Sequence, residues 1–289
     1  MALPASGAIS MSQVNTELGL SATATISMND AAVRNLFGKA SGAISMSDGH
    51  GKSSEVRFIN TAARTGASIF ALMGSPTAVG NYVFENQAVC SAGTETFALR
   101  TGVFPAGSTL HIINKSTIQG RGGAGGSATV DTATVGTAGG TALHADYPCT
   151  VDNAAGYIWG GGGGGGGGQS TQFGEGMSAA WSGGGGGQGS SGGAAGSGKG
   201  ELNAATQSAG TASAAGAYGQ GYAISTSYWV RSGAGGAAGA AGGTATKSSS
   251  VGSGLYRAGG AGGAAIAKNG NAVTITAGDD TTRVKGAVA

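Results

Sequence analysis

The sequence predicts a mostly irregular and β protein, in which a small N-terminal helical repeat module and a small all-β module precede a region of packed left-handed helices. Three observations predict this arrangement. A short degenerate repeat opens the chain, strand-like segments follow it, and glycine then dominates. Only 12 of the 62 glycines lie in the first 118 of the 289 residues, and 50 lie in the last 171. The expected boundaries are 1–53, 54–119 and 120–289.

The first fifty residues repeat one motif: SGAISMS from Ser6, ATISMND from Ala24, and SGAISMS again from Ser41. Two copies lead into a short helix, one capped by Ser12 and the other by Asn29, and a glycine ends each helix. In the third copy the string DGHGKS replaces the helix. Such small units bury little surface alone, so residues 1–53 are expected to pack against a partner or their own copies.

The string GHGKS ends like a phosphate-binding P-loop, but the rest of that motif is missing. A P-loop has a glycine five residues before the glycine that precedes its lysine, and Met46 occupies that position. No buried strand leads into the string either. A solvated turn is the better interpretation.

Residues 54–119 show the pattern of short strands separated by Gly, Pro and Asn. The strand-like segments are VRFI, SIFALM, NYVFEN, TFALR and STLHIIN. The last strand, Leu110 to Ile118, runs directly into the first glycine motif, so a continuous structure without a flexible hinge is expected there. The chain ends with two more strand-like segments, Ala272 to Thr276 and Thr282 to Val288.

The glycine-rich region differs from a flexible linker in its period and in its flanks. Glycines recur at 233, 236, 239 and 242, and aromatic side chains bracket the nine-glycine run at 160–168. Three residues per turn is the polyproline II repeat, which has no internal hydrogen bonds and must pair with neighbouring backbones. Glycine, without a Cβ, permits that approach. We expect about seven glycine motifs, of which the fourth, at 183–200, could form two helices.

Low-complexity disorder is the main alternative for this region, because few apolar side chains are available to build a core. Collagen fits less well. The Gly-X-Y register breaks repeatedly, and the whole chain has four prolines.

Charge and composition argue against several functions. The 15 basic and 13 acidic residues give a net charge of +2, which provides no electrostatic footprint for nucleic acid. No apolar stretch approaches the ~20 residues of a spanning helix, and the N-terminus lacks the pattern of a secretory signal, so no membrane insertion is expected. Cys90 and Cys149 are too few for a disulfide scaffold and are expected to be free.

No catalytic or metal site emerges from the sequence. His144 and Asp146 lie near Cys149, but a zinc site needs three or four ligands, and no further His or Cys is close in the sequence. No nucleophile elbow occurs in a strand-turn-helix context. We therefore expect no enzymatic activity, no metal and no cofactor.

The chain from Phe104 to Ala289 resembles the polyglycine-rich, receptor-recognising adhesins at the tail fibre tips of T-even-like bacteriophages. The matching strings are TLHIINKSTIQGRGGAGG, GYIWGGGGGGGGGQS, the GGGGG block from Gly183, and GGAGGAAIAKNGNAVTITAGDDTTRVKGAVA. The resemblance implies a sandwich of polyglycine II helices whose connecting loops recognise a host outer-membrane protein or surface glycan. Residues 1–53 are more similar to short modules in tail proteins of long-tailed phages, which implies contact with other tail or fibre proteins.

The resemblance also implies a place in the virion, at the distal tail or the tail fibre tip, after synthesis in the host cytoplasm without a signal peptide. Two other functions stay open. The protein could be a structural tail-tip or baseplate protein without receptor contact, or an ice-binding protein, for which flat faces of Ala and Thr would be the signature.

If successive glycine helices run antiparallel, the loops after odd-numbered motifs gather at one end of the sandwich. That set includes Gln169 to Ser182 and Ala223 to Ser232, whereas the even set includes His144 to Ala155 and Asn203 to Ala215. The odd loops carry residue types favoured at binding hot spots. The receptor-binding candidates are Phe173, Met177, Trp181, Tyr228, Trp229 and Arg231. Alternatively, these side chains only cover the open end of a lattice that lacks a side-chain core.

Overall fold

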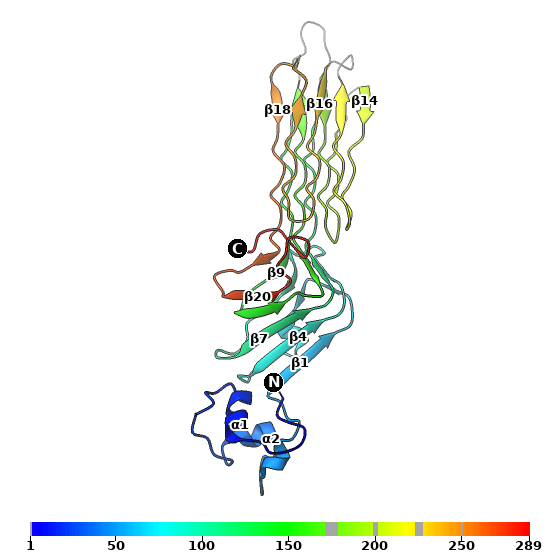
Figure 1. Ribbon diagram of the computed structural model, residues 1–289. Helices are drawn as coiled ribbons and strands as arrows, with labels where there is room; N and C mark the ends of the chain where they lie inside the picture. Colours follow the sequence, from blue (N-terminus) through cyan, green and yellow to red (C-terminus); the bar gives the residue numbers. More distant parts are fainter. Residues whose placement is uncertain (1, 171–178, 199–201, 223–227, 250) are drawn as a thin grey trace.

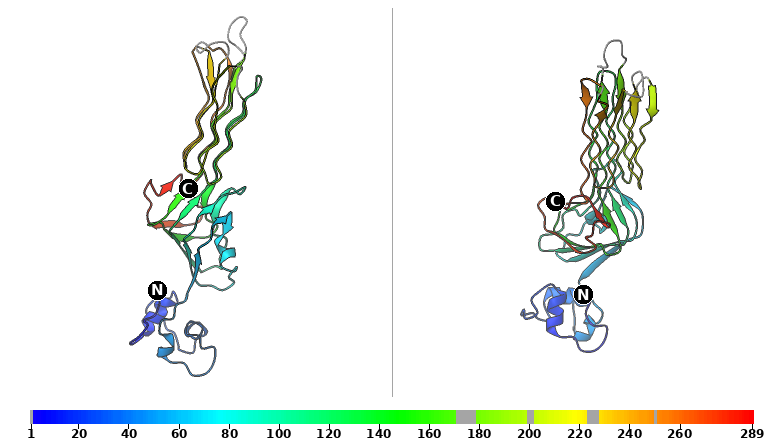
Figure 2. Two further views of the ribbon diagram at one scale, coloured as in Figure 1. Left: turned by 90° about the vertical axis from the view of Figure 1, so that its right-hand side faces the viewer. Right: turned by 45° about the horizontal axis from the view of Figure 1, so that its top comes forward.

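The computed structural model describes residues 2–170, 179–198, 202–222, 228–249 and 251–289. The protein is mostly β and elongated, with three parts in line (Figure 1). Short helices lie at the end that contains the N-terminus, parallel sheets form the middle, and long extended segments reach the far end. Figure 2 shows the same order from two other directions.

The N-terminal module contains α1 (Met11–Glu17), α2 (Ala31–Phe37) and the 3-10 helix η1 (Met46–Gly49). Ser10, not Ser12, caps α1, because its side chain accepts from the Gln13 backbone while the Gln13 side chain accepts from the Ser10 backbone. Asp30, not Asn29, is the residue that precedes α2. Gly38 ends α2 in the left-handed conformation, as expected.

The N-terminal repeat makes the same local bond three times. The backbone N–H groups of Ser10, Ser27 and Ser45 each donate to the side chain three residues later, at 2.8, 2.8 and 2.9 Å. The third copy therefore forms a helical turn where an open turn was expected. The three copies enclose a small core made of Leu3, Ile9, Val14, Val33, Leu36 and Phe37.

Three parallel sheets form the middle of the protein, and successive turns of the chain add strands to each of them. We call this part the solenoid. The first sheet contains β1 (Glu55–Asn60), β4 (Asn81–Asn86), β7 (Thr109–Asn114), β10 (Cys149–Asp152) and β20 (Val273–Ala277). The second contains β2 (Arg64–Thr65), β5 (Cys90–Ser91), β8 (Thr117–Gln119), β11 (Tyr157–Trp159) and β21 (Val284–Lys285). The third contains β3 (Ala67–Ser68), β6 (Phe97–Arg100), β9 (Thr141–His144) and β19 (Ile266–Ala267).

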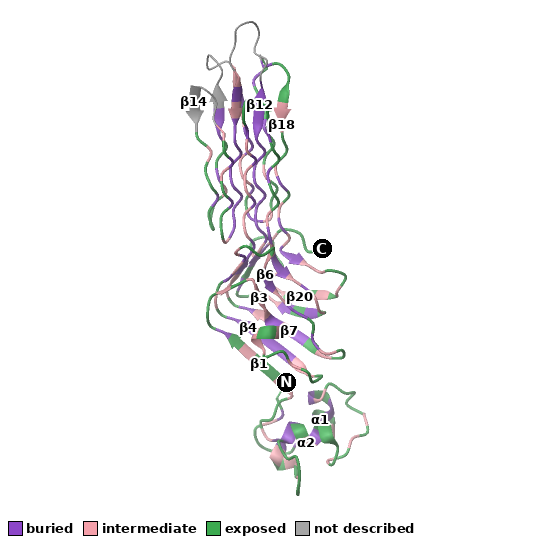
Figure 3. Cartoon of the chain, turned by 180° about the vertical axis from the view of Figure 1, so that it is seen from behind, coloured by how far each residue is buried: buried purple, intermediate pink, exposed green. Residues whose placement is uncertain are grey.

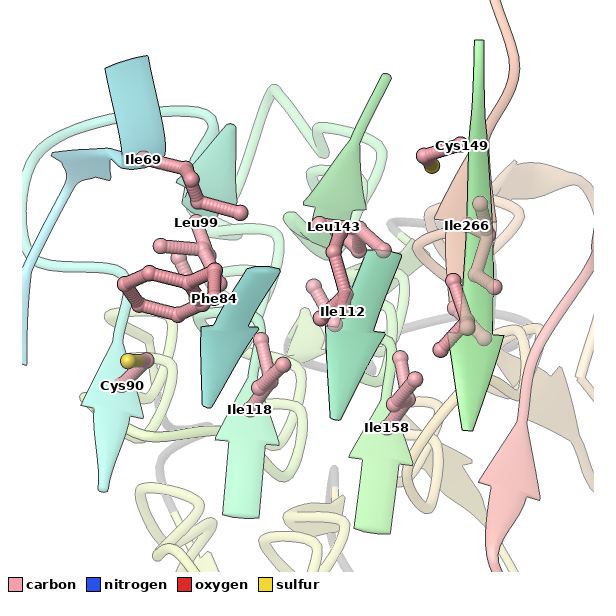
Figure 4. Close-up of a cluster of buried hydrophobic side chains, with 14 of the residues drawn as sticks. Ile69, Phe84, Cys90, Leu99, Ile112, Ile118, Leu143, Cys149, Ile158 and Ile266 are labelled. Carbon is pink, nitrogen blue, oxygen red and sulfur yellow. The ribbon is translucent and has the colours of Figure 1, made fainter. Parts of the chain in front are cut away.

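Apolar side chains fill the interior of the solenoid (Figure 4). Phe84 pairs in register with Phe58 and Ile112 on the neighbouring strands, and the Phe58 and Phe84 rings stack with their centroids 5.9 Å apart. Cys90 and Cys149 are free thiols in this core, as expected. Burial raises their pKa to about 11 and about 12. Thiols in such surroundings are unreactive, so these two serve packing.

An asparagine ladder runs along one corner of the solenoid. The carboxamide of Asn60 donates to Asn86, Asn86 donates to Asn114, and Asn114 donates to Asn153, at 2.9, 2.9 and 2.8 Å. Each of the four is at most 1% exposed. Arg64 donates to Asn60 at one end, and Asn153 donates to the Gly278 carbonyl at the other. The ladder therefore links all the turns of the solenoid.

The solenoid extends beyond the range 54–119 expected for the β module. Strands after residues 140 and 265 complete its later turns, because parallel partners need not be close in the sequence. Two local predictions were wrong. The SIFALM segment forms the end of β3 and then the short helix α3 (Ile69–Leu72), which Ser68 caps. The predicted strand Leu110 to Ile118 divides at a corner into β7 and β8.

The glycine-rich segments form two insertions in the solenoid, 120–140 between β8 and β9 and 160–265 between β11 and β19. We call them together the glycine lattice. Successive segments run away from the solenoid and back again, side by side (Figure 1). They span 120–126, 134–140, 160–168, 183–189, 191–198, 208–211, 214–219, 233–237, 240–243 and 257–263. The motifs at 183–200 and 233–243 thus each contain two segments.

The run at 160–168 bonds to neighbours on all its sides. Its N–H groups donate in turn to three segments: those of 161, 164 and 167 to 134–140, those of 162 and 165 to 185–188, and those of 163 and 166 to 240–243. Its carbonyls accept in turn from 120–126, 233–239 and 257–263. Every third residue therefore faces the same neighbour. No glycine of this run has a positive φ.

Side chains would not fit between these segments. A Cβ on any residue from 160 to 167 would lie under 3.0 Å from a backbone atom of a neighbouring segment, a distance that real Cβ atoms do not show. The interior of the lattice is therefore built from backbone alone, and its order depends on glycine at each of these positions.

The near end of the lattice is joined to the solenoid by hydrogen bonds. The Ser190 hydroxyl accepts from the Ala92 N–H and donates to the Ala92 carbonyl, both at 3.0 Å. The Gln119 side chain donates to the Ala212 carbonyl at 2.9 Å. These bonds fit the continuous junction expected from the sequence.

Candidate functional site

Short antiparallel strands lie at the far end of the glycine lattice, which we call the distal end (Figure 1). One sheet contains β13 (Ala180–Ser182), β12 (Gly168–Ser170) and β18 (Gly254–Tyr256). The other contains β14 (Leu202–Ala205), β15 (Gln220–Tyr222), β16 (Trp229–Arg231) and β17 (Thr246–Lys247). Buried lattice segments lead to these strands (Figure 3). The lattice therefore supports the distal strands from below.

The structure brings the described candidate residues to this one end. Trp181 lies in β13, Trp229 and Arg231 lie in β16, and Tyr228 directly precedes β16. All four are partly exposed. Phe173 and Met177 lie outside the described residues. The expectation that the loops after 160–168 and after 216–221 share one end is confirmed for their described parts.

Arg231 is held between two aromatic rings. Its guanidinium carbon lies 4.5 Å from the centre of the Trp229 ring and 5.3 Å from that of Tyr218. Its Nε donates to the side-chain oxygen of Gln220, which is 6% exposed. The cation is therefore fixed in position by stacking and by a buried amide.

A small apolar cluster fixes the outward direction of Trp229 and Arg231. Val230, between them in β16, is fully buried with Ala180 and near Val251, which is 3% exposed. Alternate residues of a strand point to opposite faces, so the burial of Val230 places its two neighbours on the outer face.

Lys247 holds the loop that follows β17. Its ammonium group donates to the carbonyls of Val251 and Gly252 at 2.7 and 2.6 Å and lies 5.6 Å from the centre of the Tyr256 ring. The Trp229 N–H donates to the Ser248 hydroxyl at 3.2 Å, which joins this loop to β16. Ser248, Val251 and Gly252 are thus held beside the candidate residues.

Sequence reasoning missed Tyr218, Gln220 and Lys247 as members of this group. Their signal was weak, because each is a single polar or aromatic residue among small ones. The pairing of β15 with β16 sets Gln220 opposite Arg231, and the pairing of β16 with β17 sets Lys247 opposite Val230. These pairings bring the residues together.

The segments expected at the opposite end are divided. His144 to Ala155 lies in the solenoid, at the near end, as predicted. Asn203 to Ala215 does not stay there, because β14 pairs with β15 at the distal end, whereas the turn at 211–214 is tied to the solenoid side. This segment crosses the full lattice, because the motif at 183–200 contains two lattice segments and 208–211 then returns to the solenoid side.

A second group of partly exposed aromatic residues lies on the solenoid. The Tyr157 and Trp159 rings are 5.1 Å apart, Arg283 lies 5.9 Å from the Tyr157 ring, and Lys285 lies 4.3 Å from the Trp159 ring. The Trp159 indole donates to the Thr282 carbonyl at 3.1 Å. Trp159, like Trp229, therefore has a cation over its ring. Unlike Trp229, it lies away from the distal end.

His144, Asp146 and Cys149 are not brought together as one group in the part of the chain that is described. The His144 ring lies 3.4 Å from the Asp146 carboxylate, but Arg100 binds that carboxylate through two N–H groups at 2.7 and 2.8 Å. Cys149 packs in the solenoid core. Among the described residues, no three His, Cys, Asp or Glu side chains come together to hold a metal.

Within the same residues, no helix is both long and apolar enough to cross a bilayer.

The chain is similar to a known family and to a solved structure. A family model described as phage tail fibre adhesin Gp38 matches residues 39–289. No curated protein matches the chain. The fold is similar to a chain in the crystal structure of the gp37-gp38 adhesin tip complex of the bacteriophage S16 long tail fiber, with 21% identity and a TM-score of 0.51. The match covers 98% of this chain and 99% of that one.

Proposed function

Because the chain belongs to the Gp38 family of phage tail fibre adhesins, we propose that it recognises a receptor on the host bacterium through the distal end of its glycine lattice. As an adhesin of this family it is a protein of the virion tail fibre. The receptor is an outer-membrane protein or a surface glycan, and the protein acts by binding, without catalysis. Family membership favours this function over ice binding.

We propose further that the lattice is a sandwich of polyglycine II helices. Three features support this. The central run has negative φ throughout, its hydrogen bonds repeat every third residue, and it donates to three neighbouring segments while it accepts from three others. These are the properties of a left-handed helix with three residues per turn that bonds only to its neighbours.

The observation that carries the function is the position of Trp181, Trp229 and Arg231 at the end of a rigid lattice. Both ends of each distal connection are anchored in backbone-bonded segments. Side chains held in this way lose less conformational entropy on binding, so a small contact surface can still be selective. Tryptophan and arginine are also the residue types that most often dominate binding energies.

The test compares tryptophans at the two ends of the protein. We expect Trp181→Ala and Trp229→Ala each to weaken binding of the purified protein to host cells by ~2 kcal/mol, about 30-fold. Trp159→Ala is the matched control, because Trp159 is also stacked under a cation but lies on the solenoid. It should bind like the wild type. Thermal melting establishes that each variant is folded.

If the folded Trp181→Ala and Trp229→Ala variants bound host cells as tightly as the wild type does, the assignment of the distal end would be contradicted. A loss with Trp159→Ala alone would assign recognition to the solenoid. If the wild-type protein did not bind host cells at all, the structural tail-tip or baseplate function would be the better conclusion.

We propose that residues 1–53 attach the adhesin to another fibre protein. The similar solved structure is a complex of gp37 with gp38, and the N-terminal module has a core of its own, distinct from that of the solenoid. The family match begins at residue 39, so it covers only the third copy of the repeat. Attachment through this module would leave the distal end free to face the host.

A further inference from the structure

We propose that Arg231 binds a carboxylate in an acidic segment of a host surface protein. This inference rests on the proposed function, because it assigns the chemistry of the partner at the distal end. It goes further because it names the side chain that binds a charged group of the partner, and because it identifies the partner as a protein.

The contacts of Arg231 preorganise its side chain to bind a carboxylate. Contacts with the Trp229 and Tyr218 rings hold its guanidinium, and the bond from Nε to Gln220 fixes one edge of the group. An arginine held in this way loses little side-chain entropy when it binds, and its planar fork matches the two oxygens of a carboxylate.

The two terminal nitrogens of Arg231 are not used by the described residues. A guanidinium has five N–H donors, and Nε provides only the one that reaches Gln220. In the described part of the chain, no carboxylate forms an ion pair with Arg231, and neither Nη atom has a hydrogen-bond partner. Among the described residues, the cation is thus positioned without a counterion.

The charge around Arg231 favours an acidic partner. The described residues of the distal end carry Arg231, Lys247 and Arg257, against the single acidic residue Asp131. Lys247 and Arg257 already donate to backbone carbonyls, which leave their charge uncompensated. Carboxylate and phosphate would both suit this potential.

The surroundings of Arg231 favour a protein over a phosphorylated glycan. Trp229 is partly exposed and Tyr218 is 39% exposed, so each presents apolar ring surface next to the cation. Paired aromatic and arginine anchors on an outer strand face are typical of protein–protein hot spots, where apolar contact excludes water from a charged bond. An acidic side chain flanked by apolar residues would satisfy both parts of this surface.

The experiment measures binding of the full-length protein to three probes from one host: intact cells, outer-membrane proteins extracted from them, and their purified lipopolysaccharide. The variants are Arg231→Gln, which removes the charge, and Arg231→Lys, which keeps the charge but loses the planar fork. Arg257→Gln is the control for charge alone, because Arg257 donates to the Ala133 carbonyl and no aromatic ring of a described residue lies against its guanidinium. Melting temperature and tryptophan fluorescence report folding.

We expect Arg231→Gln to weaken binding to cells and to the extracted proteins by about tenfold or more, and Arg231→Lys to weaken it to a smaller extent. The difference between wild type and Arg231→Gln should shrink as salt rises from about 0.05 to about 0.5 M. Amidation of the carboxyl groups on the probe should weaken the wild type and leave Arg231→Gln unchanged. Arg257→Gln should bind nearly as the wild type does.

If both Arg231 variants bound the probes as tightly as the wild type does, the inference would be overturned and the proposed function would stay intact. A loss that is insensitive to salt and to carboxyl amidation would have the same consequence, since it would indicate a structural function for Arg231. Binding to lipopolysaccharide in place of the extracted proteins would overturn the choice of partner. If Arg231→Gln did not fold, the Arg231→Lys variant would decide, and wild-type affinity there would overturn the inference.

Discussion

At the scale of single residues, Gly163 shows what the lattice requires. A Cβ there would press against the carbonyl of Gly260, and backbone atoms of a hydrogen-bonded neighbour have little freedom to move. At Gly243, in the same lattice, the nearest atom to such a Cβ is 3.2 Å away. The two glycines therefore differ in how much a single methyl group would disturb their surroundings.

We expect Gly163→Ala to lower the free energy of unfolding by at least the ~1 to 3 kcal/mol of an overpacked core. Gly243→Ala, the matched control, should cost clearly less, because its neighbour has to move only a few tenths of an ångström. Thermal melting of both variants measures the difference. Equal melting temperatures for Gly163→Ala and the wild type would contradict the close packing of the lattice.

A second residue, Glu85, makes the stability of the solenoid depend on pH. Hydrogen bonds from Lys115 and then Gln87, helped by the nearby Arg57, hold the pKa of Glu85 below its ordinary value in spite of burial. A carboxyl group whose pKa is lower in the folded than in the unfolded protein stabilises the fold at pH values above its unfolded pKa. That contribution is lost as the pH falls through the folded pKa.

We therefore expect the melting temperature to be constant above about pH 5 and to fall below about pH 4. Glu85→Gln cannot change its charge, so this variant should be less stable at neutral pH and should show a smaller decrease in acid. A decrease of the same size in Glu85→Gln would assign the acid sensitivity to other carboxylates.

At the scale of elements, the asparagine ladder joins strands that are distant in the sequence. Asn114 is its central member: it accepts from Asn86 and donates to Asn153 and to the Tyr157 carbonyl. Replacing it with Leu would leave a buried donor on one side and a buried acceptor on the other. Unpaired buried groups cost more than the bond that is lost.

Asn114→Leu should lower the free energy of unfolding by about 2 kcal/mol or more. Asn271→Ala is the comparison, because this partly exposed asparagine makes one bond, to the Ala145 carbonyl. Chemical denaturation of both variants gives the two values. If the two losses were equal, the ladder would contribute no more than an ordinary surface bond.

The N-terminal module is the element whose independence can be tested directly. Its core is distinct from the solenoid core, and its described bonds to the solenoid include those that the Asn81 and Ser54 side chains donate to the Glu17 carbonyl. Removal of residues 1–53 should leave the melting temperature of the remainder nearly unchanged, but should abolish incorporation into the fibre. Normal incorporation of the shortened chain, or its failure to fold, would contradict attachment through this module.

At the scale of the whole molecule, the sequence predicted local patterns better than long-range pairing. The period of three in glycine correctly indicated close backbone packing, because each third residue meets one neighbour. The parallel solenoid was missed, since strands such as β7 and β10 are separated by the insertion at 120–140. One signal was present: asparagine ends the strand-like segments at Asn60, Asn86 and Asn114, and returns at Asn153.

The candidate site was predicted in part for a similar reason. Trp181, Trp229 and Arg231 stood out as large residues among small ones, so the sequence alone identified them. The positions of Tyr218 and Gln220 beside Arg231 depend on the pairing of β15 with β16. Local composition does not determine which strands pair, and so it could not assemble the group.

The orientation of the lattice also has a mechanical consequence for a particle tethered to a cell. The N-terminal module and the distal strands lie at opposite ends of the protein (Figure 1), so tension between cell and fibre would run along the lattice segments. The hydrogen bonds of the lattice cross from segment to segment, roughly perpendicular to that tension. They would be loaded together in shear, and no single bond would have to break first as in unzipping. The rod should therefore stay stiff under a pull, and the load should pass to the solenoid through all the crossings where the two insertions leave it and return.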